Sequence, residues 1–245
     1  MVNSSIQGAK PAIPKIPRLL LLAALAAMTL GADDQGCESQ SSASVDADTV
    51  HAAYWLYYDS DRDITFARAQ FRFGSPVGTT LILEEPAQVS FNGAPMAFNA
   101  LLDWHEIEMA GRIDGGEFRY LDVEGDEFTN TAPGYRESQV LSVPAAIDSN
   151  ESFELRWSGG ALVENELLET VVARDNNRLD FIRVDQRGIG ATSVVLPADR
   201  LQTLGRGEAV ISVRRHRDLP LTDATSAGGK ITVTFQAPDR LTRIE

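Results

Sequence analysis

The 245-residue chain contains a single cysteine, Cys37, and comparatively few basic residues. One cysteine cannot form an intramolecular disulfide, so the fold must rest on its own packing even in an oxidising compartment. Lysine and arginine number 22 against 35 aspartates and glutamates, for a net charge of −13. A protein this acidic is repelled by phosphate backbones and by anionic lipid, which argues against nucleic-acid binding and against polybasic attachment to a membrane.

Common catalytic and metal-binding motifs are also missing. No Gly-x-Ser-x-Gly sequence occurs, and Cys37 precedes the region with strand patterns, so neither supplies a nucleophile. The histidines are scattered and form no pair with metal-ligand spacing: His51, His105 and His216. Glu106 and Glu108 share one strand face, but such pairs are ordinary on the solvated faces of an acidic β protein. We therefore expect no enzyme activity and no cofactor.

Long apolar runs are confined to the N-terminus. The stretch from Leu19 to Ala32, LLLLAALAAMTLGA, follows three basic residues and is preceded by no acidic residue. It is shorter than the ~20 apolar residues that a membrane-spanning helix needs. A basic segment followed by a short apolar run is typical of a secretory signal peptide. We predict that residues 1–32 are a signal peptide and that the protein is exported.

Cys37 is the candidate site of lipidation. Bacterial lipoprotein signals place small residues directly before the modified cysteine, and of Asp34, Gln35 and Gly36 only the glycine fits. The polar sequence around and after Cys37 predicts a flexible, disordered tether over residues 33–50. We predict a lipid anchor at Cys37 in the bacterial outer membrane or at the cell surface. Cleavage without lipidation, giving a periplasmic or extracellular protein, is the alternative.

From His51 onward the pattern is that of a β protein. Apolar residues alternate with polar ones in short runs, and Gly, Pro, Asn and Asp interrupt the runs every 8–12 residues. We predict an all-β fold with two tandem immunoglobulin-like β-sandwiches, over residues 51–133 and 137–238, separated at the Pro-Gly of TAPGYRES. A single larger sandwich is the alternative.

Two hairpins are expected in the first half. Asn92-Gly93 is the preferred type I′ turn. It would place three apolar pairs on one face: Phe91 with Ala94, Val89 with Met96 and Ala87 with Phe98. A second turn at Glu124-Gly125 would set Leu121 opposite Phe128.

The patterns of three other segments predict their local structure. In ITFARAQFRF the apolar parity switches between Phe66 and Phe71, which predicts a β-bulge or a strand that changes sheets. Residues 161–174 are compatible with a helix, but with the sequence that follows they favour a hairpin. The basic run from Arg214 to Arg217 should split between the two faces of a strand and pair with acids.

Aspartates and aromatic residues at the start of the β region raise two possible sites. Asp59, Asp61 and Asp63 match the first three ligands of a calcium loop, but Ile64 and Gln70 stand where Gly and Glu are required. We assign no metal site, and keep calcium as the alternative to a solvated acidic turn.

The aromatic run at residues 54–58 could serve as a stacking platform for sugars. Neighbours on a strand point to opposite faces, so Trp55 and Tyr57 would share one face, while Tyr54 and Tyr58 would share the other. We expect core packing with one partly exposed face. The exposure of Trp55, Trp104 and Trp157 would decide whether a glycan surface exists.

Three segments carry a family resemblance: YYDSDRDITFARAQFRFGSPVGTTLILEEPAQVSFNG, GRIDGGEFRYLDVEGDEFTNTAP and SAGGKITVTFQA. They resemble a loose group of uncharacterised bacterial exported proteins with lipoprotein-type leaders and immunoglobulin-like or fibronectin-like domains. The resemblance implies a β-sandwich fold and export from the cell, and it implies no activity.

The expected function is that of an exported, membrane-tethered, non-catalytic structural or binding protein, whose partner is a protein or glycan of the cell envelope. One alternative is a soluble periplasmic or secreted adhesion or carbohydrate-binding module. The other is a hydrolase with an unrecognised site.

Overall fold

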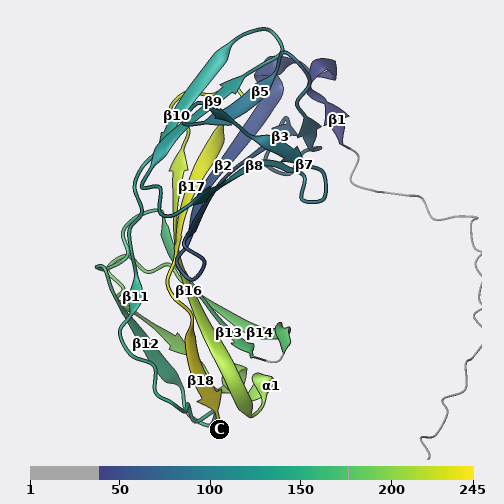
Figure 1. The fold of residues 1–245 in the computed structure, drawn as a ribbon. Coiled ribbons are helices and arrows are strands. Elements are labelled where there is room, and N and C mark those ends of the chain that lie inside the picture. Colours follow the sequence, from purple (N-terminus) through teal and green to yellow (C-terminus); the bar gives the residue numbers. More distant parts are fainter. Residues whose placement is uncertain (1–38, 176) are drawn as a thin grey trace, which may run out of the picture. The chain divides into compact units, whose positions relative to one another are not determined.

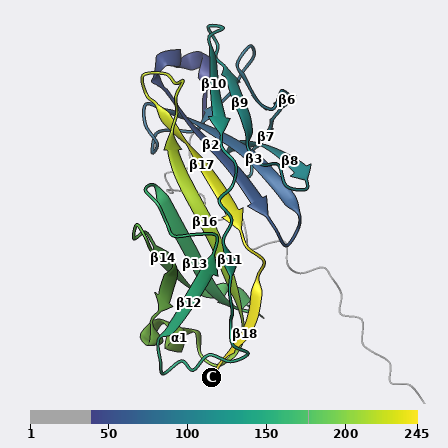
Figure 2. The same cartoon turned by 90° about the vertical axis from the view of Figure 1, so that its left-hand side faces the viewer.

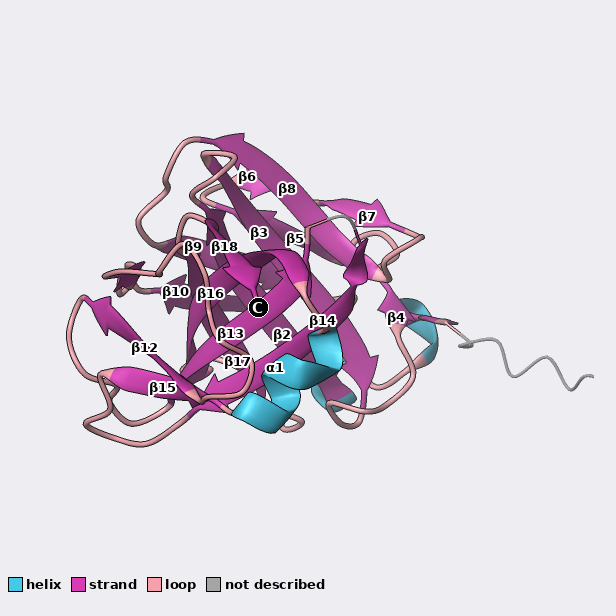
Figure 3. Cartoon of the chain, turned by 90° about the horizontal axis from the view of Figure 1, so that it is seen from below, coloured by secondary structure: helices cyan, strands magenta, loops and turns pink. Residues whose placement is uncertain are grey.

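The computed structural model describes residues 39–175 and 177–245, and confirms the all-β expectation. In chain order the strands are β1 (Gln40–Ser41), β2 (Val50–Asp59), β3 (Ile64–Phe73), β4 (Leu81–Ile82), β5 (Gln88–Phe91), β6 (Ala94–Pro95), β7 (Ala97–Asn99), β8 (Trp104–Ala110), β9 (Gly116–Leu121), β10 (Glu127–Ala132), β11 (Gln139–Val140), β12 (Phe153–Ser158), β13 (Glu166–Arg174), β14 (Asn177–Gln186), β15 (Ser193–Leu196), β16 (Gly207–Pro220), β17 (Gly229–Gln236) and β18 (Arg240–Ile244). One α-helix, α1 (Ala198–Leu204), lies beside β14 (Figure 3).

A nine-stranded sheet forms the centre of the fold (Figure 1). Its strand order is β14-β13-β16-β17-β2-β3-β8-β7, and β18 also pairs with β16. Every pairing in it is antiparallel except that of β17 with β2. Two smaller sheets, β10-β9-β5-β6 and β11-β12-β15, form the second layer of the fold.

Each smaller sheet covers a different end of the same face of the nine-stranded sheet (Figure 2). At one end, Tyr54 of β2 stacks on Phe118 of β9, with ring centroids 4.7 Å apart. At the other, Leu155 of β12 is fully buried in the same hydrophobic core as Leu168 of β13 and Ile211 of β16. Strict alternation along these strands sends one set of side chains into this core, as a sandwich requires.

The two expected domains are not separate, because the nine-stranded sheet draws on both. The boundary at residues 131–138 does divide β10 of one small sheet from β11 of the other. However, β17 lies in the second expected domain and pairs along its whole length with β2 of the first. β16 pairs with β18 near its start and with β17 near its end, so it runs through both regions. The prediction of two independent units is corrected on this point, and an immunoglobulin-like topology stays a prediction.

Residues 39–50 are ordered, which corrects the predicted tether in that segment. β1 pairs in parallel with β4, and two short 3-10 turns, Ser42–Ser44 and Ala47–Thr49, follow it. The Ser42 hydroxyl accepts a hydrogen bond from the Glu84 amide at 3.1 Å, and Asp48 accepts one from the Ser226 amide at 2.8 Å. The polar side chains that suggested disorder are used to fasten this segment to the body of the protein. Residues 33–38, with Cys37, lie outside the described residues.

The first predicted hairpin is confirmed in its turn and wrong in its last pair. Asn92 and Gly93 have φ values of +49° and +78°, as a type I′ turn requires, and Phe91 lies opposite Ala94. Beyond Met96 the chain crosses to the nine-stranded sheet, where Phe98 pairs with His105 instead of Ala87.

The second predicted hairpin exists, but its register is shifted by one residue. β9 pairs with β10 so that Leu121 lies opposite Glu127, and Tyr120 lies opposite Phe128. The Asp122 side chain accepts hydrogen bonds from two loop amides and so holds a longer loop than the two-residue turn that was expected. A slip of one residue exchanges the faces of a strand, so Leu121 points outward.

The segment after residue 161 forms a hairpin, as predicted, with β13 antiparallel to β14. The predicted bulge in β3 is wrong, because β3 pairs with β2 in continuous register from Ile64 to Phe73. Phe71 faces the core, whereas Phe66 lies on the opposite face of the same regular strand and is nevertheless 5% exposed. The switch of parity therefore marks a second apolar surface, and not a distortion of the strand.

Candidate ligand-binding surface

The second face of the nine-stranded sheet, here called the outer face, points away from the smaller sheets. Side chains alternate along each strand, so this face receives Trp55 and Tyr57 from β2 and Arg68 from β3. Trp55 lies in register with Arg68 on one side and with Thr232 of β17 on the other. In Figure 1 the strands at the two ends of the sheet, β8–β7 and β13–β14, lie toward the same side of the central strands.

Two adjoining depressions lie on the outer face. The first has a volume of ≈ 400 Å³ and is lined by Trp55, Tyr57, Arg68, Trp104, Arg214, His216, Thr232 and Thr234. The second has a volume of ≈ 350 Å³ and is lined by Trp55, Asn165, Leu167, Glu169, Arg183, Arg187, His216, Asp218, Lys230 and Thr232. Trp55, His216 and Thr232 belong to both, so the two depressions form one continuous surface across the strands.

Arg68 lies against two aromatic rings of the first depression and against Phe66. Its guanidinium carbon lies 4.7 Å from the ring centroid of Trp104, 4.8 Å from that of Phe66 and 5.9 Å from that of Tyr57. The same guanidinium is paired with Glu106 on β8. Cation–π contacts and the ion pair hold Arg68 in place. They also cover Phe66, which explains why an outward-facing phenylalanine is buried.

A hydrogen-bond network holds the floor of the depressions. Arg214 donates from Nη1 to Glu169 at 2.8 Å, and from Nε to the Gln236 amide oxygen at 2.9 Å. That oxygen also accepts from the Tyr57 hydroxyl. His216 Nδ1 lies 2.9 Å from the Thr234 hydroxyl. Because these side chains are already held in one arrangement, a ligand would lose little affinity in ordering them.

His216 sits where the two depressions meet. Burial lowers the pKa of its imidazole below the ordinary value of 6.5, although Glu169 opposes the shift. The imidazole is therefore neutral near neutral pH. Among the described residues, His216 Nε2 and Trp104 Nε1 have no hydrogen-bond partner. Both atoms are buried, as are five other unpaired side-chain atoms of the described residues, so a bound molecule could reach them only if the side chains that cover them move.

The aspartates of the calcium alternative occupy the turn between β2 and β3. Asp59 accepts the backbone amides of Asp61 and Arg62, Asp61 accepts the amide of Asp239, and Asp63 accepts the Tyr58 hydroxyl at 2.9 Å. The carboxylates of Asp59 and Asp63 thus contribute to the turn itself, and that of Asp61 joins the turn to the segment between β17 and β18. Across residues 39–175 and 177–245, no three His, Cys, Asp or Glu side chains come together as a metal-binding group.

The glutamates that follow His105 each lie beside an arginine. Glu106 is committed to Arg68, whereas Glu108 lies 3.9 Å from Arg62 at an exposed position. His105 itself is buried, with Nδ1 3.3 Å from the carbonyl of Met96.

The basic run splits between faces as predicted. Arg214 and His216 line the depressions, while Arg215 is buried and bound to Glu166.

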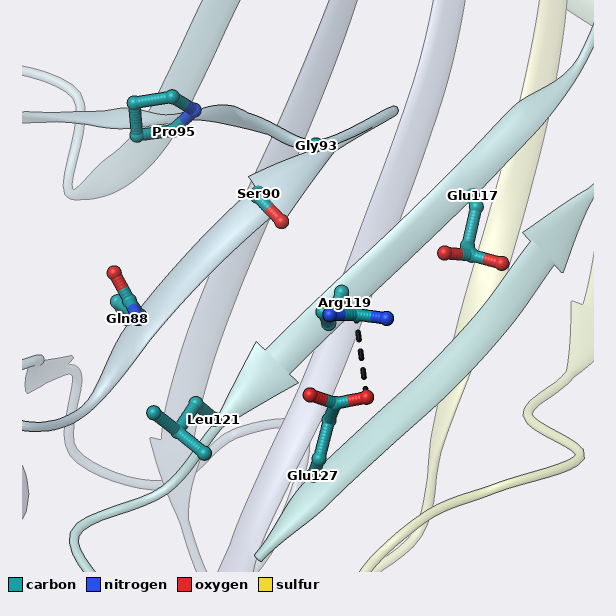
Figure 4. A pocket seen from close by; sticks show the side chains of 8 residues that line it. All are labelled: Gln88, Ser90, Gly93, Pro95, Glu117, Arg119, Leu121 and Glu127. Atoms are coloured by element: carbon teal, nitrogen blue, oxygen red, sulfur yellow. Dashed lines mark ion pairs between the residues drawn. The ribbon is translucent and has the colours of Figure 1, made fainter. Parts of the chain in front are cut away.

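A third depression, of ≈ 490 Å³, lies on the four-stranded sheet (Figure 4). Its lining residues come from β5, β6, β9 and β10 and from the turn at Gly93, and Arg119 pairs with Glu127 at 3.3 Å. Figure 4 shows these side chains spread over an open sheet surface, and no aromatic ring is among them. We therefore place the candidate site on the outer face of the nine-stranded sheet.

Sequence reasoning assigned Trp55 and Tyr57 to one face but did not connect them with Trp104, Arg214 or His216. The parity switch at Phe66 was the available signal, since it marked a strand that is apolar on both faces.

A scan against protein-family models finds no match, and a search of the curated proteins finds no similar sequence. Within the described residues, none of the helices combines the length and the apolar character needed to cross a membrane.

Proposed function

We propose that this protein is an exported, non-catalytic binding protein, tethered to a bacterial membrane through Cys37, that holds its ligand on the outer face of the nine-stranded sheet. The main support for this proposal is the pair of joined depressions around Trp55. A surface that combines aromatic rings with hydrogen-bonded polar groups is typical of binding sites. Within this surface the carboxylates are engaged by arginine or lysine, which supports binding over acid–base chemistry.

The three tryptophans provide a direct test of the binding surface. Trp55 and Trp104 line the depressions, whereas Trp157 is 4% exposed in the core under the three-stranded sheet. In a Trp157→Phe variant, all tryptophan fluorescence comes from the outer face. We expect a fraction of bacterial envelope polymers to shield this fluorescence from acrylamide quenching.

The matched control carries Trp55→Phe and Trp104→Phe and retains Trp157. Its fluorescence should not respond to the same fraction. The envelope polymers are tested as a polysaccharide fraction and as a protein fraction. If neither fraction shields the tryptophans of the Trp157→Phe variant, the outer face is not the binding surface.

The tether is tested separately by metabolic labelling with a fatty-acid analogue. The wild-type protein should carry the label and the Cys37→Ser variant should not. Label on both would place the acyl group at another residue, and label on neither would mean that there is no lipid anchor; either result excludes the proposed anchor at Cys37.

A further inference from the structure

We infer that the ligand of the outer face is an acidic oligosaccharide, a short stretch of a polysaccharide that carries carboxylates, lying across the strands with its sugar rings against Trp55 and Trp104. This inference rests on the proposed function and names its ligand. It is carried by three features of the joined depressions: their length, their aromatic rings and their charge.

The length of the surface fits a chain of sugars better than a single small molecule. The lining residues begin with Trp104 on β8 and end with Arg183 and Arg187 in and after β14. These strands are separated by six inter-strand spacings of about 4.8 Å, so the surface is ~29 Å long. Because the two depressions share Trp55, His216 and Thr232, one chain of sugars could occupy both.

The rings and polar groups match the two kinds of surface that a sugar presents. A pyranose ring has an apolar face that packs on tryptophan, and an edge of hydroxyl groups that hydrogen-bond. Trp55 stands between the two depressions, where it can contact a sugar on either side. The exposed side chains of Arg187 and Lys230 supply hydrogen-bond donors for the hydroxyls.

The charge of the lining is opposite to that of the molecule. Acidic residues outnumber basic ones in the chain, which has a net charge of −13. Around the depressions the excess is reversed, because only Glu169 and Asp218 are carboxylates, whereas five side chains are cationic: Arg68, Arg183, Arg187, Arg214 and Lys230. A cationic surface on an acidic protein favours a ligand with carboxylates.

Several of these cations are free to reach a ligand. The side chains of Arg187, Arg183 and Lys230 are 70%, 48% and 46% exposed, and their ion pairs are with partly exposed or shared carboxylates. Exposed ion pairs contribute little energy, so exchanging a protein carboxylate for a ligand carboxylate costs little.

Nucleic acid is the competing ligand, because it combines rings with negative charge. Its phosphates are densely spaced, at one charge per ~1.7 Å of duplex, and each neutralising contact needs a free cation. Here only five cationic side chains line a surface ~29 Å long, too few to match that density of charge. The sparser carboxylates of an acidic glycan fit this surface better.

The test uses three probes of similar length and the full chain. They are a galacturonic acid pentasaccharide, the same pentasaccharide with its carboxylates methyl-esterified, and a single-stranded oligothymidylate. Binding is measured by calorimetry and by the fluorescence of Trp55 and Trp104. We expect the acidic pentasaccharide to bind at least about tenfold more tightly than its ester. Raising the salt concentration from about 50 mM to about 500 mM should remove most of that difference, because screening weakens exposed charge contacts.

Three variants locate the contacts. Trp55→Ala should weaken binding of the acidic pentasaccharide about tenfold, the effect of losing one stacked ring. Arg187→Gln together with Lys230→Gln should weaken the acid while leaving the ester unchanged. Arg119→Gln, an exposed ion-paired arginine on the other sheet, is the control and should alter neither affinity. Trp55 is an outward residue, and equal thermal transitions would show that its replacement leaves the fold intact.

The possible failures are distinguishable. If the ester binds as tightly as the acid and Trp55→Ala weakens both, the surface binds glycans but the acidic class is wrong. If only oligothymidylate binds, or if only the protein fraction of the envelope shields the tryptophans, the glycan inference is overturned and the binding surface stands. If no probe and no envelope fraction affects Trp55 and Trp104, both proposals fall.

Discussion

Gly159 shows how one residue without a side chain can be required by its surroundings. Its φ is +93°, and a Cβ at this position would lie 2.0 Å from the carbonyl oxygen of Glu137. The adjacent Gly160 carbonyl accepts hydrogen bonds from both Arg215 and Trp157, so the loop is held at this point. The close approach of two backbone segments leaves no room for a larger residue.

We therefore predict that Gly159→Ala lowers the free energy of unfolding by about 2–4 kcal/mol, from left-handed strain and from the clash together. Gly125→Ala is the matched control, because Gly125 has the same φ of +93° and open space where the Cβ would be. It should cost only the strain, about 1 kcal/mol. Urea denaturation of both variants gives the comparison, and equal losses would show that the contact with Glu137 is unimportant.

At the scale of the element, β16 places adjacent arginines in opposite environments. Arg214 faces the candidate site, and Arg215 is 2% exposed on the core side. The Arg215 guanidinium donates to Glu166 and to the Ala161 carbonyl at 2.9 Å. Glu166 also accepts two hydrogen bonds from Arg136, each 3.0 Å long. This network joins the loop at residues 159–161 to the pair β13–β16.

Arg215→Met should lower the free energy of unfolding by about 3–5 kcal/mol, because it removes a partner from the buried Glu166 carboxylate. Arg156→Met provides the control on β12, since Arg156 and Glu154 form an exposed pair and the loss should be close to zero. Chemical denaturation measures both. A small loss for Arg215→Met would mean that Arg136 alone compensates Glu166.

Predictions for individual strands succeeded where a local pattern decides the outcome. Asn92-Gly93 specified a turn because few residues adopt positive φ at both positions. The register of β9 with β10 was missed by one residue, since it depends on side-chain hydrogen bonds of Asp122 within the loop. The parity switch in β3 predicted a bulge that does not exist, because the strands that cover an apolar residue on the second face are distant in sequence.

At the scale of the whole molecule, β17 makes the two halves of the chain interdependent. Ile231 and Val233 of β17 are buried beside β2, more than 170 residues away in sequence. A fragment of residues 39–133 lacks this strand, so the core side of β2 would be exposed along one edge. We predict that the fragment alone is unfolded.

Fusing residues 227–237 to that fragment through a flexible linker should increase its ordered content, as measured by circular dichroism and by NMR chemical-shift dispersion. A fusion in which Ile231 and Val233 are replaced by Asp is the control and should stay unfolded. A well-dispersed spectrum from residues 39–133 alone would show that the first half is an independent domain.

The histidines link the stability of the molecule to pH. Burial lowers the pKa values of His51, His105 and His216 below the ordinary 6.5. The unfolded chain therefore takes up protons before the folded protein does. The free energy of unfolding should therefore be highest above about pH 6.5, where the histidines are neutral in both states, and should fall as the pH drops below that value.

Urea denaturation at about pH 7.5 and about pH 5.5 tests this dependence. A His105→Phe variant keeps an aromatic ring against Phe71 and Phe98 and removes one titrating group, so its pH dependence should be shallower. Equal or higher stability at the lower pH would contradict the expectation.

Local patterns were enough to predict the all-β class, the turn at Asn92-Gly93, the separation of Trp55 and Tyr57 from the core side of β2, and the acidic charge. These follow from alternation, from backbone preferences and from counting. Three features depend on contacts between distant parts of the chain: the pairing of β17 with β2, the attachment of residues 39–50 to the body, and the shared surface of Trp55, Trp104, Arg214 and His216. Pairing between distant strands depends on which sheet edges remain available when the chain collapses, and no local pattern records that choice.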